Sequence, residues 1–494
     1  MTAYTVGVDI GTTGTKTVLF DTECGIVAQT SRTATLFSEH PGWAEADPQQ
    51  WLANVVDSIA ELVASAGISP SDVRAVATTG MVPAVVAVDA AGRPLRRAIL
   101  QNDARATDEI RTLAAQLADI DLVGLTGAAL TQQSVAPTAL WLHRHEPDIA
   151  SQTAHFVGSY DWVLMALGAD PHVETNWALE SGLFTIGGDP VGEVLAAADI
   201  DAVALAPVLH PGQVAGRLSA EMAERTGLAV GTPLVVGGAD HVLSAFAAGV
   251  EEHGDWLVKL GGAGDILVAS DEPVVDARLY LDAHPVPGRW LPNGCMATSG
   301  SLIRWFQSLV GGEDLLRLDA EAHECRPAEV LCLPYFLGEK SPLHDPDLRG
   351  VYAGLHLGTT RADMYRSTLE AIAFGFRHHV EVFAELGIEL GRASITNGGS
   401  KSTLWKQIHA EVLGAPMYPI VDHPGASLGA ALIAAVGVEV LADWEQCRRF
   451  ITLGEPVLPD PEKVAVYDAA YQEWRNLASA TAGISHSLAE RTRQ

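Results

Sequence analysis

Two aspartates at the ends of apolar segments are the residues best suited to chemistry in this chain. Asp9 ends the segment V-G-V-D and precedes the turn Gly11–Thr15, which reads G-T-T-G-T. Glycines let the backbone approach a ligand closely, and successive N–H groups with threonine hydroxyls can hold phosphate oxygens. A carboxylate beside such a turn offers the hard oxygen ligand that a divalent metal ion prefers. The segment therefore predicts phosphate binding with Asp9 as a metal ligand, and an ordinary hairpin turn is the alternative.

The second aspartate, Asp240, lies between glycines and a small-residue helix, in the segment G-G-A-D-H. A carboxylate in such a place can face a ligand without crowding it. Phosphoryl transfer to an alcohol needs a base that accepts or orients the hydroxyl proton. Asp240 is the candidate base, and the alternative is a helix N-cap, where Asp is common. We interpret His241 as a structural neighbour of Asp240 rather than a metal ligand.

Glycine turns follow apolar strands at three distant places in the sequence, namely Gly11–Thr15, Gly261–Gly264 and Gly398–Ser400. Together they fit a nucleotide in a cleft, with its phosphates held from both sides and its base at the third turn. A helix expected from Ser402 can add the N–H groups of its N-terminus. Three unrelated tight turns are the alternative. The first turn is not a Walker A loop, which would need the pattern G-x-x-x-x-G-K-[ST], and it is not a Rossmann fingerprint, because it leads into a strand. Lys16 therefore stays open between a surface role and a phosphate role.

Strands and helices alternate in both halves of the chain, which indicates an α/β fold. The first half is expected to contain strands at 6–21 (a hairpin), 26–30, 73–78, 85–100 (a second hairpin) and 234–238, and helices at 49–65 and 241–249. The second half repeats the strand–glycine turn–strand design at 256–268, followed by a strand at 393–399 and helices at 402–413 and from 425. This repetition predicts a duplicated α/β unit, with domains at 1–248 and 249–494 facing each other across a cleft.

Composition excludes several classes of function. The formal net charge is −30, with 61 acidic against 31 basic residues, which disfavours nucleic acid or an anionic membrane as a partner. No apolar run is long enough to cross a bilayer, and the first residues lead into a strand without the pattern of a signal peptide. The 5 cysteines form no C-x-x-C pair, so neither a disulfide framework nor a zinc site is predicted. A reducing cytoplasm is the expected location.

Residues 338–355 resemble the signature stretch of the FGGY carbohydrate kinases, reading G-E-K-S-P-L-H-D-P-D-L-R-G-V-Y-A-G-L. The family's pattern continues through 363–371, and further segments match it in order and spacing at 9–13, 43–48, 102–105, 237–240, 397–400 and 425–429. The resemblance covers about residues 4 to 440. It implies two ribonuclease-H-like domains of the actin and hexokinase type, with ATP and a sugar in the cleft between them.

The resemblance also implies roles for individual residues. Asp240 is implied as the catalytic base, and Asp9 as a residue that helps to hold Mg²⁺ or its waters. The phosphates are assigned to Gly11, Thr12, Thr13, Gly261 and Gly262, the adenosine side to Gly398, Gly399 and Ser400, and the sugar pocket to Gly80, Met81, Asn102, Asp103 and Asp240. ATP and Mg²⁺ are the implied cofactors. A small sugar or polyol is the implied partner, and a homodimer is retained as a candidate assembly.

Three segments depart from the family's pattern. The usual Met-His-Gly is Met81-Val82-Pro83, Trp-Asn-Asp is Gln101-Asn102-Asp103, and Gly-Thr-Ser-Gly is G-G-A-G at 261–264. The first two changes alter contacts to sugar, and the third removes hydroxyls but keeps the backbone N–H groups.

The expected function is ATP-dependent phosphorylation of a sugar hydroxyl, with a pentulose such as D-xylulose as the best candidate. Other polyols, deoxysugars and sugar acids stay open as acceptors. Two other classes are an actin- or chaperone-like ATPase and a non-catalytic sugar sensor. The first would lack the sugar-kinase signature, and the second typically lacks the catalytic aspartate.

Overall fold

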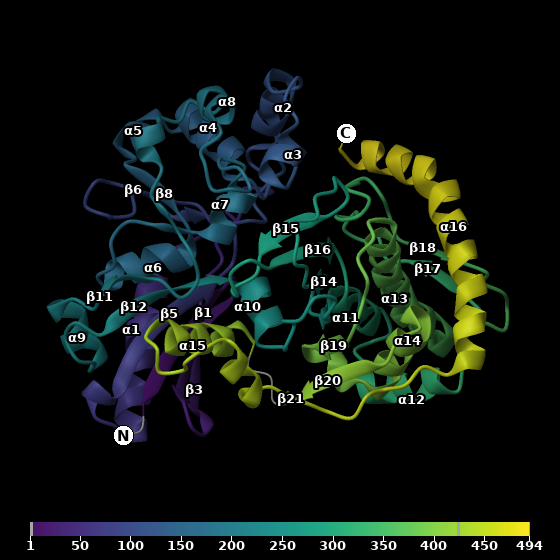
Figure 1. Cartoon of the computed structure of the whole chain (residues 1–494). Helices are drawn as coiled ribbons and strands as arrows, with labels where there is room; N and C mark the ends of the chain where they lie inside the picture. Colours follow the sequence, from purple (N-terminus) through teal and green to yellow (C-terminus); the bar gives the residue numbers. More distant parts are fainter. Residues whose placement is uncertain (1–2, 422–424, 494) are drawn as a thin grey trace.

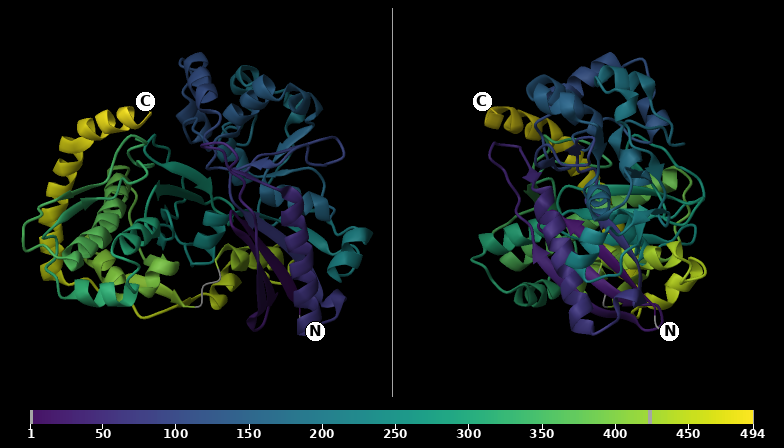
Figure 2. Two further views of the ribbon diagram at one scale, coloured as in Figure 1. Left: turned by 180° about the vertical axis from the view of Figure 1, so that it is seen from behind. Right: turned by 90° about the vertical axis from the view of Figure 1, so that its left-hand side faces the viewer.

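The computed structural model describes residues 3–421 and 425–493, which form two α/β halves side by side (Figures 1 and 2). The first half is built on a six-stranded sheet with the order β11-β12-β5-β1-β2-β3. Its strands are β1 (Tyr4–Gly11), β2 (Gly14–Asp21), β3 (Gly25–Thr33), β5 (Val73–Gly80), β11 (Val214–Arg217) and β12 (Pro233–Ala239). The opening hairpin predicted from the sequence is thus confirmed.

The second half contains a seven-stranded sheet with the order β15-β16-β14-β13-β19-β20-β21. Its strands are β13 (Trp256–Leu260), β14 (Gly264–Val268), β15 (Tyr280–Ala283), β16 (Trp290–Met296), β19 (Ala393–Thr396), β20 (Met417–Val421) and β21 (Thr452–Leu453). In both sheets three antiparallel strands precede two parallel ones, as β3-β2-β1-β5-β12 and as β16-β14-β13-β19-β20. The duplicated unit inferred from the shared opening is therefore present in the topology.

Helices cover the sheets and fill the long connection between β5 and β12. The first half contains α1 (Pro48–Ala66), α2 (Thr107–Gln116), α3 (Leu122–Thr126), α4 (Val135–His145), α5 (Pro147–Gln152), α6 (Ser159–Leu167), α7 (Thr175–Ser181), α8 (Gly192–Ala197), α9 (Ala220–Thr226) and α10 (Asp240–Phe246). As expected, α1 begins after Asp47, whose side chain accepts a hydrogen bond from Gln49 N at 2.9 Å. This cap satisfies one of the N–H groups that a helix start leaves open.

The hairpin expected at 85–100 forms, and each of its arms also pairs with a strand outside it. The turn is present, and β6 (Val86–Val88) pairs with β8 (His155–Val157), and β7 (Ala98–Ile99) pairs with β4 (Glu45–Ala46). The two arms are joined to each other by backbone hydrogen bonds, from Leu95 N to Ala87 O at 2.9 Å and between Val85 and Ile99 in both directions at 2.8 and 3.0 Å. Partners that are distant in sequence thus add to the local pairing.

The helices of the second half are α11 (Gly300–Leu309), α12 (Leu315–His323), α13 (Arg361–Glu385), α14 (Thr403–Leu413), α15 (Ala426–Gly437) and α16 (Pro461–Arg493), the last running along the outer edge in Figure 1. Although α15 comes late in the sequence, it packs on β1 and β5 of the first half. Gly7 of β1 permits this contact, because a Cβ there would lie 2.0 Å from Ser427 O. The domain boundary expected at 248/249 therefore remains a proposal, because α15 lies after it in the sequence but packs on the first half.

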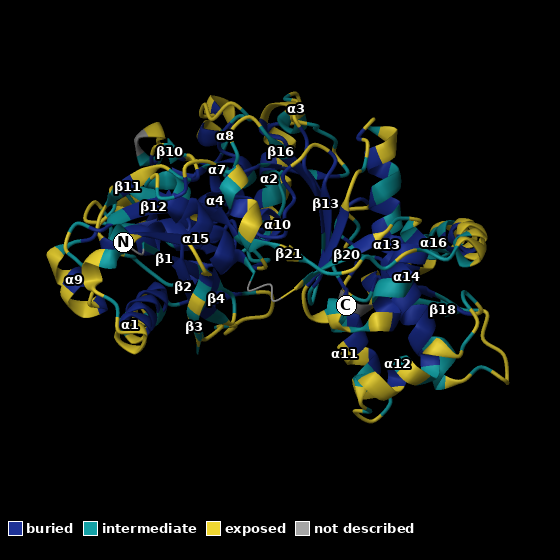
Figure 3. Cartoon of the chain, turned by 60° about the horizontal axis from the view of Figure 1, so that its bottom comes forward, coloured by how far each residue is buried: buried dark blue, intermediate teal, exposed yellow. Residues whose placement is uncertain are grey.

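Each half has its own hydrophobic core, visible as the buried centres in Figure 3. The first core includes buried residues of α15 as well as those of the first sheet. Within the described part of the chain, no helix combines the length and the apolar character that a membrane span requires.

Candidate active site

Three parallel strands of the first half end at one edge of the sheet, beside the second half. Asp9 of β1 is in register with Thr79 of β5, and Ala239 of β12 is in register with Gly80. Because the carboxyl ends of parallel strands meet at one edge, Asp9 and Asp240 are brought together there with β5 between them. Asp240 is the first residue of α10, whose N-cap position is Ala239 and has no side-chain cap. The N-cap alternative for Asp240 is therefore wrong.

Asp9 is a strongly perturbed carboxyl group. Its Oδ1 is buried and accepts no hydrogen bond from any of residues 3–421 or 425–493. Burial, followed by the negative charge of Asp240, raises the pKa of Asp9 to about 7, although Lys259 and Lys16 act in the opposite direction. Asp240 is near enough for its charge to act on Asp9, in keeping with the register of β1, β5 and β12. An unsatisfied carboxylate oxygen beside a phosphate turn fits a divalent cation, which prefers such hard ligands.

Asp240 has the opposite shift because a histidine follows it. His241 Nδ1 lies 3.6 Å from Asp240 Oδ1, and His241 Nε2 donates to Asp282 Oδ2 at 2.7 Å. Burial raises the pKa of Asp240, but His241 and the charge of Lys259 outweigh it and hold the pKa below its usual range. Burial also opposes the charge on His241, yet Asp282 and Asp240 raise its pKa well above the usual value. Asp240 is therefore an ionised acceptor at neutral pH.

Lys259 supplies a fixed positive charge between the carboxylates, a role that the sequence analysis missed. It lies on β13, directly before the second glycine turn, and its Nζ is 3.3 Å from Asp265 Oδ2. Burial disfavours its charged form, but Asp265, Asp240 and Asp9 together raise its pKa. The ammonium group is therefore retained where phosphate charge would need compensation. Its signal in the sequence is a lysine within an otherwise apolar strand.

A cavity of about 900 Å³ lies next to the third glycine turn. Gly398 and Ser400 line it, together with Asn397 and three lysines, Lys16, Lys401 and Lys406. Gly399 does not line it, since the ring of Trp405 occupies the place of a Cβ at that position, 2.2 Å away. The cavity is large enough for a nucleotide, and its lysines suit phosphate charge. Lys16 thus lies where a phosphate role requires it, although no contact with a phosphate tests that role.

The second glycine turn lies beside this cavity and is held by α11. Gly261 O accepts from Gly300 N at 2.8 Å, and Gly262 O accepts from Ser299 N at 2.9 Å. Asn397 of the third turn is also near, with its Nδ2 3.4 Å from the position of a Cβ on Gly261. The parallel pairing of β13 and β19 explains this, because both turns follow the carboxyl ends of adjacent strands. In the first turn, Thr12 Oγ1 lies 3.8 Å from Met81 Sδ, while Gly11 is half-buried and Thr13 exposed.

A second, smaller cavity of about 210 Å³ contains Asp240 and is lined from both halves. The first half contributes Met81, Val82, Gln101, Gln133, Glu180, Asp240 and His241, and the second half contributes Lys259, Ala263, Asp265, Tyr280, Asp282, Asn293, Cys295 and Lys340. Met81 and Asp240 were predicted to lie in a sugar pocket, and the structure brings them together. Most of the other lining residues were missed, because they come from short elements that carry no local motif.

Gly80, Asn102 and Asp103, also predicted for the sugar pocket, do not line this cavity. Gly80 is buried under Ile10, and Asn102 is exposed. Asp103 is buried and fully engaged, since its Oδ2 accepts from Ala44 N at 2.6 Å and its Oδ1 from Arg105 Nε at 2.9 Å. The segment 102–105 holds residues 43–46 in place through Asp103. It also positions the adjacent Gln101, which lines the cavity.

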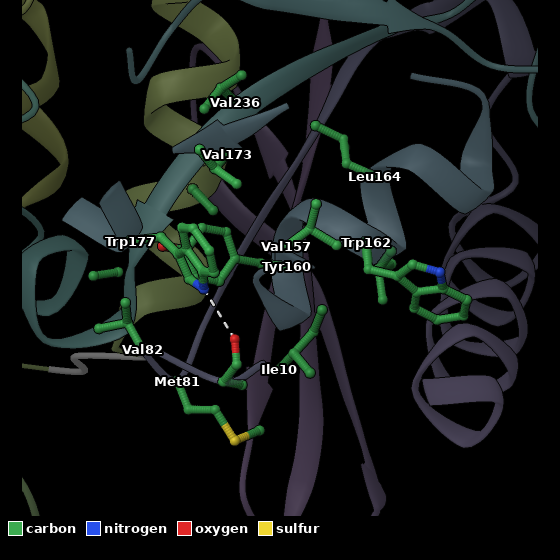
Figure 4. Close-up of a cluster of buried hydrophobic side chains, with 14 of the residues drawn as sticks. Ile10, Met81, Val82, Val157, Tyr160, Trp162, Leu164, Val173, Trp177 and Val236 are labelled. Carbon is green, nitrogen blue, oxygen red and sulfur yellow. Dashed lines mark hydrogen bonds between the residues drawn. The ribbon is translucent and has the colours of Figure 1, made fainter. Parts of the chain in front are cut away.

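The wall formed by Met81 and Val82 rests on a buried cluster (Figure 4). Trp177 of α7 lies in that cluster, and its Nε1 donates to Ala84 O at 2.9 Å, the dashed line in Figure 4. Asn176, next to it, bonds to β15 through both groups of Ala283, at 3.1 and 2.7 Å. Helix α7 therefore positions the wall of the first half and also contacts the second half.

Comparisons with known proteins agree with this geometry. The family model for the N-terminal domain of the FGGY family of carbohydrate kinases matches residues 4–247, and the model for the C-terminal domain matches residues 258–438. A xylulose kinase of Staphylococcus epidermidis is 28% identical over 96% of this chain and 97% of its own length. The crystal structure of xylulose kinase from Rhodospirillum rubrum superposes with a TM-score of 0.92 at 41% identity, covering 97% of this chain and 99% of the other.

A glycerol kinase structure from Plasmodium falciparum shares the fold with a TM-score of 0.89, covering 97% of this chain and 98% of its own, at 19% identity. The two-domain fold of the actin and hexokinase type, implied by the resemblance, is thus confirmed. The protein is a carbohydrate kinase, and the chain belongs to the FGGY family.

Proposed function

We propose that the protein transfers the γ-phosphoryl group of ATP to a hydroxyl of a pentulose such as D-xylulose. The observation that carries the proposal is the convergence of Asp9 and Asp240 at one sheet edge, with Asp240 in the smaller cavity. The names and full-length coverage of the most similar relatives support the choice of acceptor. The nucleotide is assigned to the larger cavity, which lies next to the third glycine turn.

In this mechanism the acceptor hydroxyl gives its proton to Asp240 and its oxygen attacks the γ-phosphorus in line. The bond from the γ-phosphorus to the bridging oxygen breaks, and ADP leaves with the electron pair. Asp240 is ionised at neutral pH because of His241 and Lys259, so it is ready to accept the proton. Since such a transition state needs little covalent help, the site mainly positions the reactants and compensates charge.

Asp9 is the residue proposed to hold Mg²⁺, directly or through water. When bound, the ion would compensate the phosphate charge. Lys259 would contribute a second positive charge near the phosphates, because it interacts with both Asp9 and Asp240. The phosphates are further assigned to the backbone N–H groups of Gly11–Thr13 and of Gly261 and Gly262, the latter turn braced by α11.

The test is a coupled kinase assay with D-xylulose on the wild type and on Asp240→Asn. Turnover of the variant should fall by about a hundredfold or more, as for the loss of a general base, while ATP binding measured by calorimetry stays nearly unchanged. Near-normal turnover would remove Asp240 from the mechanism. ADP formation of equal rate with and without any sugar would instead identify an ATPase of the actin or chaperone class.

A further inference from the structure

A cluster of two carboxyl groups and an imidazole lies beside Asp240. It consists of Glu180, His241 and Asp282, and one ligand atom from each lies within 4.8 Å of the others. His241 Nε2 is 2.7 Å from Asp282 Oδ2 and 3.9 Å from Glu180 Oε1. Asn293 Nδ2 also donates to Asp282 Oδ2, at 2.8 Å. The cluster is thus a polar wall of the smaller cavity, joined to Asp240 through His241.

This wall carries oxygen atoms whose hydrogen-bonding capacity is unused. Gln101 Oε1, Glu180 Oε1 and Asp282 Oδ1 are buried, and none of these atoms accepts a hydrogen bond from the described residues. The Asp282 side chain is 1% exposed. Buried acceptors without partners are costly, and folded proteins rarely keep them unless a ligand or water completes the site. Since all three residues line the cavity, its ligand is expected to bring several hydroxyl donors.

The cluster is assembled from both halves of the protein. Glu180 lies on α7 and His241 on α10 of the first half, whereas Asp282 lies on β15 and Asn293 on β16 of the second. The bonds between Asn176 and Ala283 hold α7 against β15 at the same place. The wall is therefore complete only where the halves meet.

We propose, on the basis of the proposed function, that Glu180 and Asp282 form hydrogen bonds with a second hydroxyl of the acceptor. The acceptor is a neutral, polyhydroxylated compound that is not phosphorylated. Asp240 receives the reacting hydroxyl, and His241 holds Asp282 in position through its Nε2. A neutral acceptor follows from the charge balance of the lining, which holds four carboxyl groups (Glu180, Asp240, Asp265 and Asp282) against three cationic groups (Lys259, Lys340 and His241) and so offers an anionic acceptor no surplus of positive charge. The ammonium groups in the cavity are Lys259, paired with Asp265, and Lys340, whose Nζ is 3.9 Å from Cys295 Sγ.

A metal ion is the competing occupant, because carboxylates with an imidazole are common ligands. In the structure, however, His241 Nε2 already donates a hydrogen bond to Asp282. A metal ion would have to displace the proton of that hydrogen bond. The unused oxygens of Gln101 and Glu180 are better matched by hydroxyl donors of one ligand.

The experiment combines changes in the protein with changes in the acceptor. Asp282→Asn, Glu180→Gln and the wild type are assayed with D-xylulose, with each singly deoxygenated xylulose and with gluconate. For one deoxy analogue, wild-type kcat/KM should be about 10- to 100-fold below that for xylulose, which is typical for a lost hydrogen bond that leaves a buried polar group unsatisfied. In the two variants kcat/KM for the deoxy analogue should be only about threefold below that for xylulose. This smaller ratio should come mainly from changes in KM.

A uniform loss of kcat/KM for all acceptors would overturn the proposal, since that is the pattern of a merely structural role. A higher kcat/KM for gluconate than for xylulose would also overturn it. So would a stoichiometric metal ion that survives dialysis of the wild type and is lost in Asp282→Asn. Asp271→Asn is the matched control, an exposed carboxylate of the second half whose ion pairs within the described residues are with His253 and Arg289, and it should leave the ratio unchanged.

The failure of the proposed function has a different signature, because then no acceptor in the panel would be phosphorylated by the wild type. Thermal unfolding of each variant shows whether it folds. If Asp282→Asn does not fold, Glu180→Gln alone decides, since Glu180 makes no hydrogen bond through Oε1 within the described residues.

Discussion

The pKa values of the two carboxyl groups at the centre of the site are shifted in opposite directions because their neighbours differ. Asp9 is buried beside the charge of Asp240, whereas Asp240 is stabilised by His241 and Lys259. Environments that shift the pKa values of two carboxyl groups in opposite directions suit these groups to different chemical roles. Asp240 is suited to accept a proton, and Asp9 would bind the proposed cation only after it loses its own proton.

This difference predicts a pH dependence for nucleotide binding. With a pKa of about 7 in the folded protein, Asp9 is protonated in the free enzyme below that pH, and a cation must displace the proton. The affinity for Mg·ATP should therefore fall as the pH drops from 8 to 6, by up to about tenfold per unit below 7. Calorimetry in buffers of different ionisation enthalpy should show proton release at pH 6.5.

Asp9→Asn is the comparison that isolates this group, because titration of the nucleotide itself is common to both proteins. The variant should bind Mg·ATP more weakly at pH 8 and should lack the additional proton release. Equal pH profiles for the two proteins would mean that Asp9 does not hold the cation.

Local sequence signals were sufficient for residues that act at strand ends. Asp9, Asp240 and the glycine turns could be predicted, because a strand, a turn and a carboxylate are consecutive in the chain. Lys259 was missed although a lysine within an apolar strand is a signal, and Glu180 and Asp282 could not be predicted, since they are brought together only by contacts between the two halves. Asp103 shows the reverse, as its motif was correct but Arg105 and Ala44 occupy its carboxylate.

At the level of elements, the position of α15 depends on a glycine in the first strand. A Cβ at Gly7 would lie 2.0 Å from Ser427 O and 2.5 Å from Ala431 N, both backbone atoms of α15. Backbone cannot move aside as a flexible side chain can. The helix could be predicted from the sequence, but its place on the first sheet could not, because nothing local links residues 7 and 427.

Gly7→Ala should therefore displace α15 and lower the free energy of unfolding by at least about 2 kcal/mol, within the range for overpacked cores. Urea unfolding followed by circular dichroism measures the difference. Gly483→Ala on α16 is the control, since no atom lies within 4 Å of its Cβ position, and it should be neutral or stabilising by up to about 1 kcal/mol. Equal stability of wild type and Gly7→Ala would contradict the close contact.

At the scale of the whole molecule, the chain crosses between its halves more than once. After β20 it returns to the first core through α15, and the short helix at Glu445–Phe450 continues this contact. Phe450 packs edge-on against Phe20 with ring centroids 4.6 Å apart. Arg392 also ties the connection between the halves, donating to Gly249 O and to Asp255 Oδ2. A sequence boundary at 248/249 thus separates residues that share one core.

A protein cut at that boundary tests whether the first half is an independent domain. The fragment 1–248 would lack α15 and expose the face of β1 and β5 that α15 covers, including residues that are fully buried in the intact chain. Because burial of apolar surface is the main stabilising term, we expect this fragment to unfold without cooperativity and to bind a hydrophobic dye. Joining residues 425–454 to it through a flexible linker should restore a cooperative transition. If 1–248 alone melted as sharply as the extended fragment, α15 would be dispensable, and the proposed domain boundary would also be the structural one.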